Sequence, residues 1–183
     1  MSSETYHSSD DSALLRKALM RYSGESCLEM GTGNGGGLIE LSRGFELTIG
    51  TDLGVPSNSA WRRDSVDLVL ADSASCFRDG SFDLVAFNPP YLPSDQPADR
   101  AVDGGKEGEE VTMHFLAEAM RVSRPEGRIV ILLSNENPLA PVEEVCQRNG
   151  FSIRLLETKH LFYETLSVYE IFRSGNARFS LSR

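Results

Sequence analysis

Residues 26–37 read Ser-Cys-Leu-Glu-Met-Gly-Thr-Gly-Asn-Gly-Gly-Gly, and an amphipathic run follows over residues 38–43. A short apolar strand, a glycine-rich turn and a helix in this order let the backbone approach a nucleotide-like ligand closely. Asp52 lies twenty-one residues beyond Gly31, at the end of a second strand-like run, where a carboxylate can bind a ribose diol. The stretch therefore predicts an α/β fold with a ligand site at the turn.

The turn also indicates which ligand it binds. Related glycine-rich loops occur in dehydrogenases and kinases, but here the glycines follow the pattern E-x-G-x-G-x-G rather than G-x-G-x-x-G. An acidic Glu29 beside the loop disfavours a pyrophosphate and suits a ligand with an ammonium or sulfonium charge. S-adenosyl-L-methionine carries both charges, and we predict it as the cofactor, with Glu29, Gly31 and Gly33 among its contacts.

A second motif, Asn88-Pro89-Pro90-Tyr91, ends the apolar run of residues 82–87. An asparagine carboxamide both accepts and donates hydrogen bonds, and two consecutive prolines stiffen the backbone after it. Such a rigid sheet edge, with an aromatic ring beside it, can bind a planar –NH2 group. The alternative is a proline turn after a buried strand.

Strand-like and helix-like segments alternate along the chain, which predicts a doubly wound, mostly parallel sheet. The predicted strands lie near residues 26–30, 46–52, 66–71, 82–88, 128–133, 151–156 and 166–172, and the helices near residues 11–22, 36–43, 111–122 and 141–147. The link between the last two strands is short enough for an antiparallel hairpin. Seven strands with an antiparallel last strand are the order expected of a class I methyltransferase, a Rossmann-like fold. We divide the chain into an N-terminal lid segment and helix (1–25), a methyltransferase domain (26–173) and a flexible tail (174–183).

Composition narrows the function further. The 183 residues carry a formal net charge of −9, with 27 acidic against 18 basic residues. Nucleic-acid affinity depends largely on neutralising phosphates, so DNA or RNA is an unfavourable partner for this chain.

No apolar run reaches the length of a membrane span, and the acidic N-terminus lacks a signal-peptide core. Cys27, Cys76 and Cys146 have no disulfide or metal spacing, which predicts reduced, buried thiols, no bound metal and a cytoplasmic protein.

The apolar run Val66–Ala71 is the predicted edge strand, and Asp72-Ser73 follows it. In a sheet of this topology Asp72 would reach the exocyclic amine of adenine. An exposed apolar edge promotes aggregation unless it is covered. Residues 55–64 could cover it, or a partner protein could add a strand there.

Several motifs together resemble the HemK-type glutamine methyltransferases of the short archaeal and eukaryotic branch. The opening Tyr6–Leu15 resembles Y-x-P-A-E-D-[ST]-x-L-L, although His7-Ser8-Ser9 departs from it. C-L-E-M-G-T-G-N-G, T-D-L, F-N-P-P-Y-L, V-D-G-G-K-E-G-E-E-V and E-T-L-S-V follow in family order. The N-P-P-Y motif is shared with DNA adenine methyltransferases, whereas the glycine signature and the last motif favour the branch that acts on protein glutamine.

The resemblance implies N5-methylation of the glutamine in the Gly-Gly-Gln loop of a class I peptide-chain release factor. The Asn88 side-chain oxygen and the Pro89 carbonyl would accept hydrogen bonds from the glutamine amide, with Pro90 completing the motif and Tyr91 packing against the amide. The residues implied in cofactor binding are Ser12, Glu29, Gly31, Gly33, Asp52, Leu53, Asp72, Ser73 and Asn88. Asp103, Gly104 and Gly105 would shape the substrate channel. A small zinc-binding activator protein would dock on Val66–Ala71 as a heterodimer partner.

Two other functions remain open. An N6-adenine methyltransferase acting on DNA or RNA would use the same N-P-P-Y motif, but it needs a recognition domain and a basic surface. A non-catalytic, cofactor-binding subunit of a larger complex would have no need of the intact motif. Methylation of lysine as a secondary activity also stays open, although the motif suits planar nitrogens better.

Overall fold

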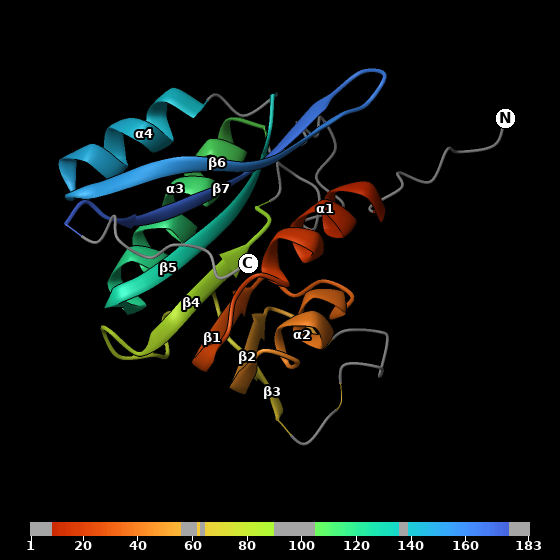
Figure 1. The fold of residues 1–183 in the computed structure, drawn as a ribbon, viewed down its shortest axis with the longest axis vertical. Helices are drawn as coiled ribbons and strands as arrows, with labels where there is room; N and C mark the ends of the chain where they lie inside the picture. Colours follow the sequence, from red (N-terminus) through yellow and green to blue (C-terminus); the bar gives the residue numbers. More distant parts are fainter. Residues whose placement is uncertain (1–8, 56–61, 63–64, 90–104, 136–138, 176–183) are drawn as a thin grey trace, which may run out of the picture.

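The computed structural model describes residues 9–55, 62, 65–89, 105–135 and 139–175. They form a seven-stranded sheet with helices on both faces (Figure 1). The strands are β1 (Gly24–Met30), β2 (Phe45–Asp52), β3 (Val66–Leu70), β4 (Phe82–Phe87), β5 (Ser123–Ser134), β6 (Phe151–His160) and β7 (Thr165–Arg173). The helices are α1 (Ser9–Leu19), α2 (Gly36–Leu41), α3 (Gly105–Val122) and α4 (Leu139–Arg148). None of the described helices is long and apolar enough to cross a membrane.

The strand order is β3-β2-β1-β4-β5-β7-β6. The first five strands pair in parallel, whereas β7 runs antiparallel to both β5 and β6. This arrangement confirms the predicted seven-stranded, mostly parallel sheet with an antiparallel last strand. Because β1, β2 and β4 are neighbours and run in one direction, the two sequence motifs that follow β1 and β4 meet at one edge of the sheet.

Alternating side chains of the central strands divide the core between the two faces of the sheet. Leu28, Val85 and Ile129 pack with residues of α3 and α4, whereas the residues next to them in sequence, such as Cys27 and Leu84, pack with α1 and α2. Successive side chains of a strand point to opposite faces, so burial of consecutive residues is the pattern of a strand covered on both sides. Helix α1 contributes four buried apolar residues to its face, which are Leu14, Leu15, Ala18 and Leu19.

Polar contacts attach α1 to the antiparallel strands. Glu157 on β6 accepts a hydrogen bond from Lys17 at 3.1 Å and one from Arg21. Just after α1, the Tyr22 hydroxyl donates to Glu170 of β7 at 2.8 Å. Burial and the negative charge of Glu170 both raise the pKa of Tyr22 far above its usual value. Glu170 is itself buried beside Arg154, so its charge is compensated inside the fold.

Some element boundaries differ from the sequence prediction. Helix α3 begins at Gly105, six residues before the predicted Val111, and β6 continues to His160 rather than ending at residue 156. The acidic residues at the start of α3 favour a helical first turn. The last four residues of β6, Glu157–His160, are all polar, so hydrophobic residues mark its first half only. The prediction of buried thiols is wrong for Cys76, which is exposed, whereas Cys27 and Cys146 are buried. The three-part division of the chain stays a prediction.

Candidate functional site

The candidate site lies at the carboxyl edge of the parallel strands. Glu29 is the residue before the end of β1, Asp52 ends β2, and Asn88 directly follows β4. Strands β2, β1 and β4 are consecutive in the sheet, so the three side chains come from neighbouring strand ends. Open α/β sheets bind ligands at this edge.

The glycine-rich turn after β1 takes a backbone shape that other residues rarely adopt. Gly31, Gly33 and Gly35 have φ angles of 69°, 53° and 76°. Asp52 accepts a hydrogen bond from the backbone N–H of Gly33 at 3.0 Å through Oδ2, and its other oxygen accepts one from Gly54 at 3.1 Å. Asp52, predicted as a ribose ligand, therefore also holds the turn in place.

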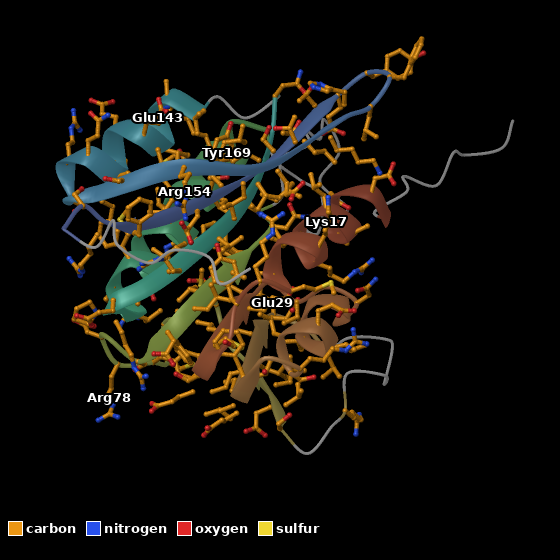
Figure 2. The ribbon with its side chains drawn as sticks, viewed as in Figure 1. Lys17, Glu29, Arg78, Glu143, Arg154 and Tyr169 are labelled. Atoms are coloured by element: carbon orange, nitrogen blue, oxygen red, sulfur yellow. The ribbon has the colours of Figure 1, made fainter. Side chains whose placement is uncertain are left out.

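Glu29 is the buried acid of the site, and it lies close to α1 and α2 in Figure 2. The backbone N–H of Leu38 donates a hydrogen bond to it, yet Oε2 has no hydrogen-bond partner among the described residues. A Cβ atom added to Gly37 would lie 1.8 Å from Glu29 Oε1, so the glycine leaves the space that the carboxylate occupies. A buried carboxylate oxygen without a partner suits a cationic ligand such as S-adenosylmethionine.

Burial raises the pKa of Glu29 to about 8, and the nearby charge of Asp52 adds to this effect, while Leu38 and Arg16 oppose it. A charged Glu29 is therefore unfavourable in the folded protein without a cationic ligand. Between the ordinary glutamate pKa and this raised value, the folded state binds more protons than the unfolded state. The free energy of unfolding consequently falls as pH rises through this window.

Replacing Glu29 with glutamine tests this electrostatic cost. Glutamine does not ionise, so we expect E29Q to gain stability relative to the wild type as pH rises from 5 to 8. The difference should be smallest at pH 5, where both side chains are neutral in the folded state. Urea unfolding of both proteins at each pH measures it. A stability difference that does not change with pH would show that Glu29 titrates at an ordinary pKa.

The two ends of the Asn88 side-chain amide differ in their hydrogen bonding within the described part of the chain. Its Nδ2 donates to Asp11 Oδ2 of α1 at 2.9 Å. Its Oδ1 is buried without a hydrogen-bond partner among the residues that the structure describes. Pro89 is buried beside it. The arrangement leaves a fixed hydrogen-bond acceptor at the end of β4, which the binding of an –NH2 group requires.

The remaining cofactor candidates lie on the two sides of this edge. Ser73 after β3 is buried with a φ angle of 51°, whereas Asp72 is exposed and lies 3.5 Å from the imidazole of His114 on α3. Leu53 is also exposed, and Ser12 on α1 is half-buried. Asp72 and Leu53 are thus accessible to a ligand that lies across β2 and β3.

Two of the predicted catalytic residues, Pro90 and Tyr91, lie outside the described part of the chain, as do Asp103 and Gly104 of the predicted substrate channel. Their roles stay predictions. Gly105, the third channel residue, is the first residue of α3.

The structure adds contacts that the sequence motifs did not indicate. A Cβ on Gly31 would lie 3.5 Å from the ring of Phe115, which forms an edge-to-face pair with Phe87 at a centroid distance of 5.8 Å. Arg16 of α1 lies against Gly36 and lowers the pKa of Glu29. Asp11 holds Asn88. No motif spacing indicates these contacts, because each joins segments that only the fold brings together.

Comparison with known proteins gives a consistent picture, although no family model matches the chain. A protein of Methanocaldococcus jannaschii described as a protein N5-glutamine methyltransferase is 28% identical over 185 residues, covering 93% of this chain and 92% of that protein. The catalytic subunit of the eRF1 methyltransferase of Schizosaccharomyces pombe is 29% identical over 102 residues, which cover 51% of this chain and 44% of that protein.

Among solved structures, the Mtq2–Trm112 complex of E. cuniculi, described as methylating the termination factor eRF1, has a TM-score of 0.73 and 26% identity. The similarity covers 92% of this chain and 98% of that one. A methyltransferase from Streptococcus mutans in complex with S-adenosylhomocysteine has a TM-score of 0.59 at 15% identity, which bears on the fold alone. The comparisons confirm the class I methyltransferase fold and the resemblance drawn from the sequence motifs.

Proposed function

We propose that this chain is a release-factor glutamine methyltransferase, which transfers a methyl group from S-adenosylmethionine to N5 of the glutamine in a Gly-Gly-Gln loop. The observation that carries the proposal is the Asn88 side chain, whose amide is fixed at one end and offers a buried acceptor at the other. This acceptor lies at the same sheet edge as the acidic glycine-rich turn. The similarity to proteins named for this reaction supports the same assignment.

The described residues suit the cofactor. The buried Glu29 oxygen would face its cationic portion, the glycine turn would admit it closely, and Asp52 would bind the ribose. Asp72 would bind the adenine amine, and Ser73, Leu53, Ser12 and Asn88 would complete the contacts. When bound, S-adenosylmethionine supplies an electrophilic methyl group on a positively charged sulfur.

The protein's part in the reaction is to prepare a poor nucleophile. The nitrogen lone pair of a glutamine amide is delocalised into its carbonyl. Asn88 Oδ1 and the Pro89 carbonyl accept hydrogen bonds from the –NH2 group, which places electron density on nitrogen and fixes its orientation. Positioning of this kind contributes most of the rate enhancement, and stabilisation of charge by preorganised dipoles adds to it. Tyr91 would pack against the amide plane, and the product amide would lose its extra proton to water.

A protein substrate is favoured over a nucleic acid by charge. The chain carries a net charge of −9, and α3, which begins beside the predicted substrate channel, is acidic in its first turns. A phosphate backbone would be repelled at such a surface. Translation termination takes place in the cytoplasm, where we place the enzyme.

A methyl-transfer assay tests the substrate class. The purified chain, with and without an activator protein, is incubated with labelled S-adenosylmethionine and either a class I release factor or adenine-containing DNA. We expect label in the release factor, more of it with the activator, and none in the DNA. Label in DNA but not in the release factor would favour the adenine methyltransferase; label in neither would favour a non-catalytic subunit.

We further propose that a small activator protein, carrying its own zinc ion, docks along β3, the predicted Val66–Ala71 strand. β3 pairs with β2 on one side and, within the described residues, with no strand on the other. Leu70 at its end is 59% exposed, and Val55, which follows β2, is exposed as well. An added strand would satisfy the free backbone groups and cover these side chains. The solved E. cuniculi relative is itself a complex with a second protein, Trm112.

Two matched substitutions test this docking edge. Leu70 on β3 and Leu155 on β6 are 59% and 54% exposed and lie on opposite edge strands of the sheet. We expect Leu70→Glu to weaken activator binding about tenfold or more, since a charge would be buried in the interface. Leu155→Glu should leave the affinity unchanged. Isothermal titration of each variant with the activator measures this, and equal effects of the two changes would rule out docking at β3.

A further inference from the structure

We infer that Asp11 is a positioning residue that sets which end of the Asn88 carboxamide faces the substrate. The inference rests on the proposed function and adds to it a residue on a different element. Asp11 lies on α1, 77 residues from Asn88 in the chain, and is only 7% exposed. Its Oδ2 accepts a hydrogen bond from Asn88 Nδ2 at 2.9 Å.

The chemistry of the two groups makes the contact directional. An ionised carboxylate only accepts hydrogen bonds, whereas an asparagine amide has a donor end and an acceptor end of nearly equal size. The –NH2 end of Asn88 must therefore face Asp11, and Oδ1 is left as an acceptor without a partner among the described residues. Hydrogen bonds to a charged group are about twice as strong as neutral ones, so the reversed orientation is disfavoured.

The orientation matters because the proposed substrate group is itself a donor. With Oδ1 toward the site, Asn88 accepts a hydrogen bond from the glutamine –NH2. With the amide reversed, two –NH2 groups would face each other and the nucleophile would be neither held nor polarised. A carboxylate at position 11 thus excludes the unproductive arrangement before the substrate binds.

Asp11 is itself fixed in the fold. Its Oδ1 accepts a hydrogen bond from the backbone N–H of Ser12 at 2.6 Å. The preceding residue, Asp10, pairs with Lys159 at the end of β6 at 2.9 Å, which ties this turn of α1 to the sheet. The carboxylate therefore has little freedom to follow Asn88 if the amide turns.

Steady-state kinetics of three variants, measured with the activator-bound enzyme and release factor, test the role. We expect Asp11→Leu, which has no acceptor, to lower kcat about 10- to 100-fold, with the KM for release factor changed less than about threefold. Asp11→Asn keeps an acceptor but also offers a donor, so its loss should be smaller. Glu144→Gln, which changes an exposed carboxylate paired with Arg148 on α4, should keep wild-type kcat.

A double-mutant cycle separates positioning from a general structural role. In an Asn88→Ala background, Asp11→Asn should lower the remaining activity by less than about twofold, because the group that it positions is gone. Full additivity of the two losses would overturn the inference. So would a loss in the single Asp11 variants that appears only in KM or in melting temperature.

An NMR measurement tests the contact between Asp11 and Asn88 independently of the methylation reaction. The side-chain –NH2 signals of Asn88, identified by their absence in Asn88→Ala, should shift and exchange faster with water in Asp11→Asn than in the wild type. Unchanged signals would refute the contact. If the wild type methylates no release factor but these signals respond to Asp11, the proposed function fails while the contact stands.

Discussion

Replacing Asn88 with alanine is expected to lower the kcat for release-factor methylation by about 10²–10³-fold, the size of effect seen when a preorganised hydrogen-bonding group is removed from a reacting centre. Alanine leaves no acceptor for the glutamine –NH2 group at the end of β4. The affinity for S-adenosylhomocysteine, measured by calorimetry, should change far less than kcat, because Glu29, Asp52 and the glycine turn remain. Single-turnover methylation assays give the rate of the chemical step.

The matched control is Asn135→Ala. Asn135 directly follows β5, the strand next to β4, but its side-chain oxygen already accepts a hydrogen bond from the Thr165 N–H at 2.8 Å. We expect this variant to keep kcat and to lose only stability, by about 0.5–1.5 kcal/mol. If the two alanine variants lose activity equally, or if Asn88→Ala retains its activity, Asn88 does not bind the glutamine amide as proposed.

Gly37→Ala, at the start of α2, is expected to weaken cofactor binding strongly. The added Cβ would lie 1.8 Å from Glu29 Oε1 and 2.5 Å from its Cδ, so the buried carboxylate must move or the turn must open. Overpacking of this kind destabilises a protein by about 1–3 kcal/mol. We expect a similar loss in cofactor binding, which weakens the affinity for S-adenosylmethionine about 10- to 100-fold.

Gly36→Ala is the control for this substitution, one residue earlier in the same helix. There the nearest atom to the added Cβ is the Nη1 atom of Arg16 at 2.7 Å, the far end of a flexible side chain that can shift. Both changes replace a glycine by alanine near the start of α2. A difference between the cofactor affinities of the two variants therefore reports on the direct contact of residue 37 with Glu29. Calorimetric titration with the cofactor should show near wild-type affinity for Gly36→Ala. Equal weakening in both variants would mean that the fit of Glu29 against Gly37 is unimportant for binding.

The sequence motifs predicted those parts of the site that depend on short segments. Strand, turn and helix around Gly31 are local, and the position of Asn88 after an apolar strand is local too. The mostly parallel sheet followed from the alternation of strands and helices, and the antiparallel pairing of β6 with β7 followed from the short link between them. These features are determined by periodicity and turn chemistry, which can be recognised without a structure.

Contacts between distant segments could not be predicted in this way. The hydrogen bond between Asp11 and Asn88 depends on how α1 crosses the sheet, which in turn depends on the packing of Leu15 and Leu19 and on the attachment of Tyr22 to Glu170. No pattern within either segment indicates the pairing. The early start of α3 and the length of β6 were missed for another reason, since polar, exposed elements lack the apolar period that marks buried ones.

Mass spectrometry of the methylated release factor tests the central claim most directly. The chain is incubated with its activator, S-adenosylmethionine and a purified class I release factor, and the peptide with the Gly-Gly-Gln sequence is fragmented. We predict one added methyl group, located on the glutamine side chain, and none when the enzyme carries Asn88→Ala. A methyl group on another residue, or an unmodified glutamine under conditions in which the enzyme methylates adenine, would contradict the proposed function.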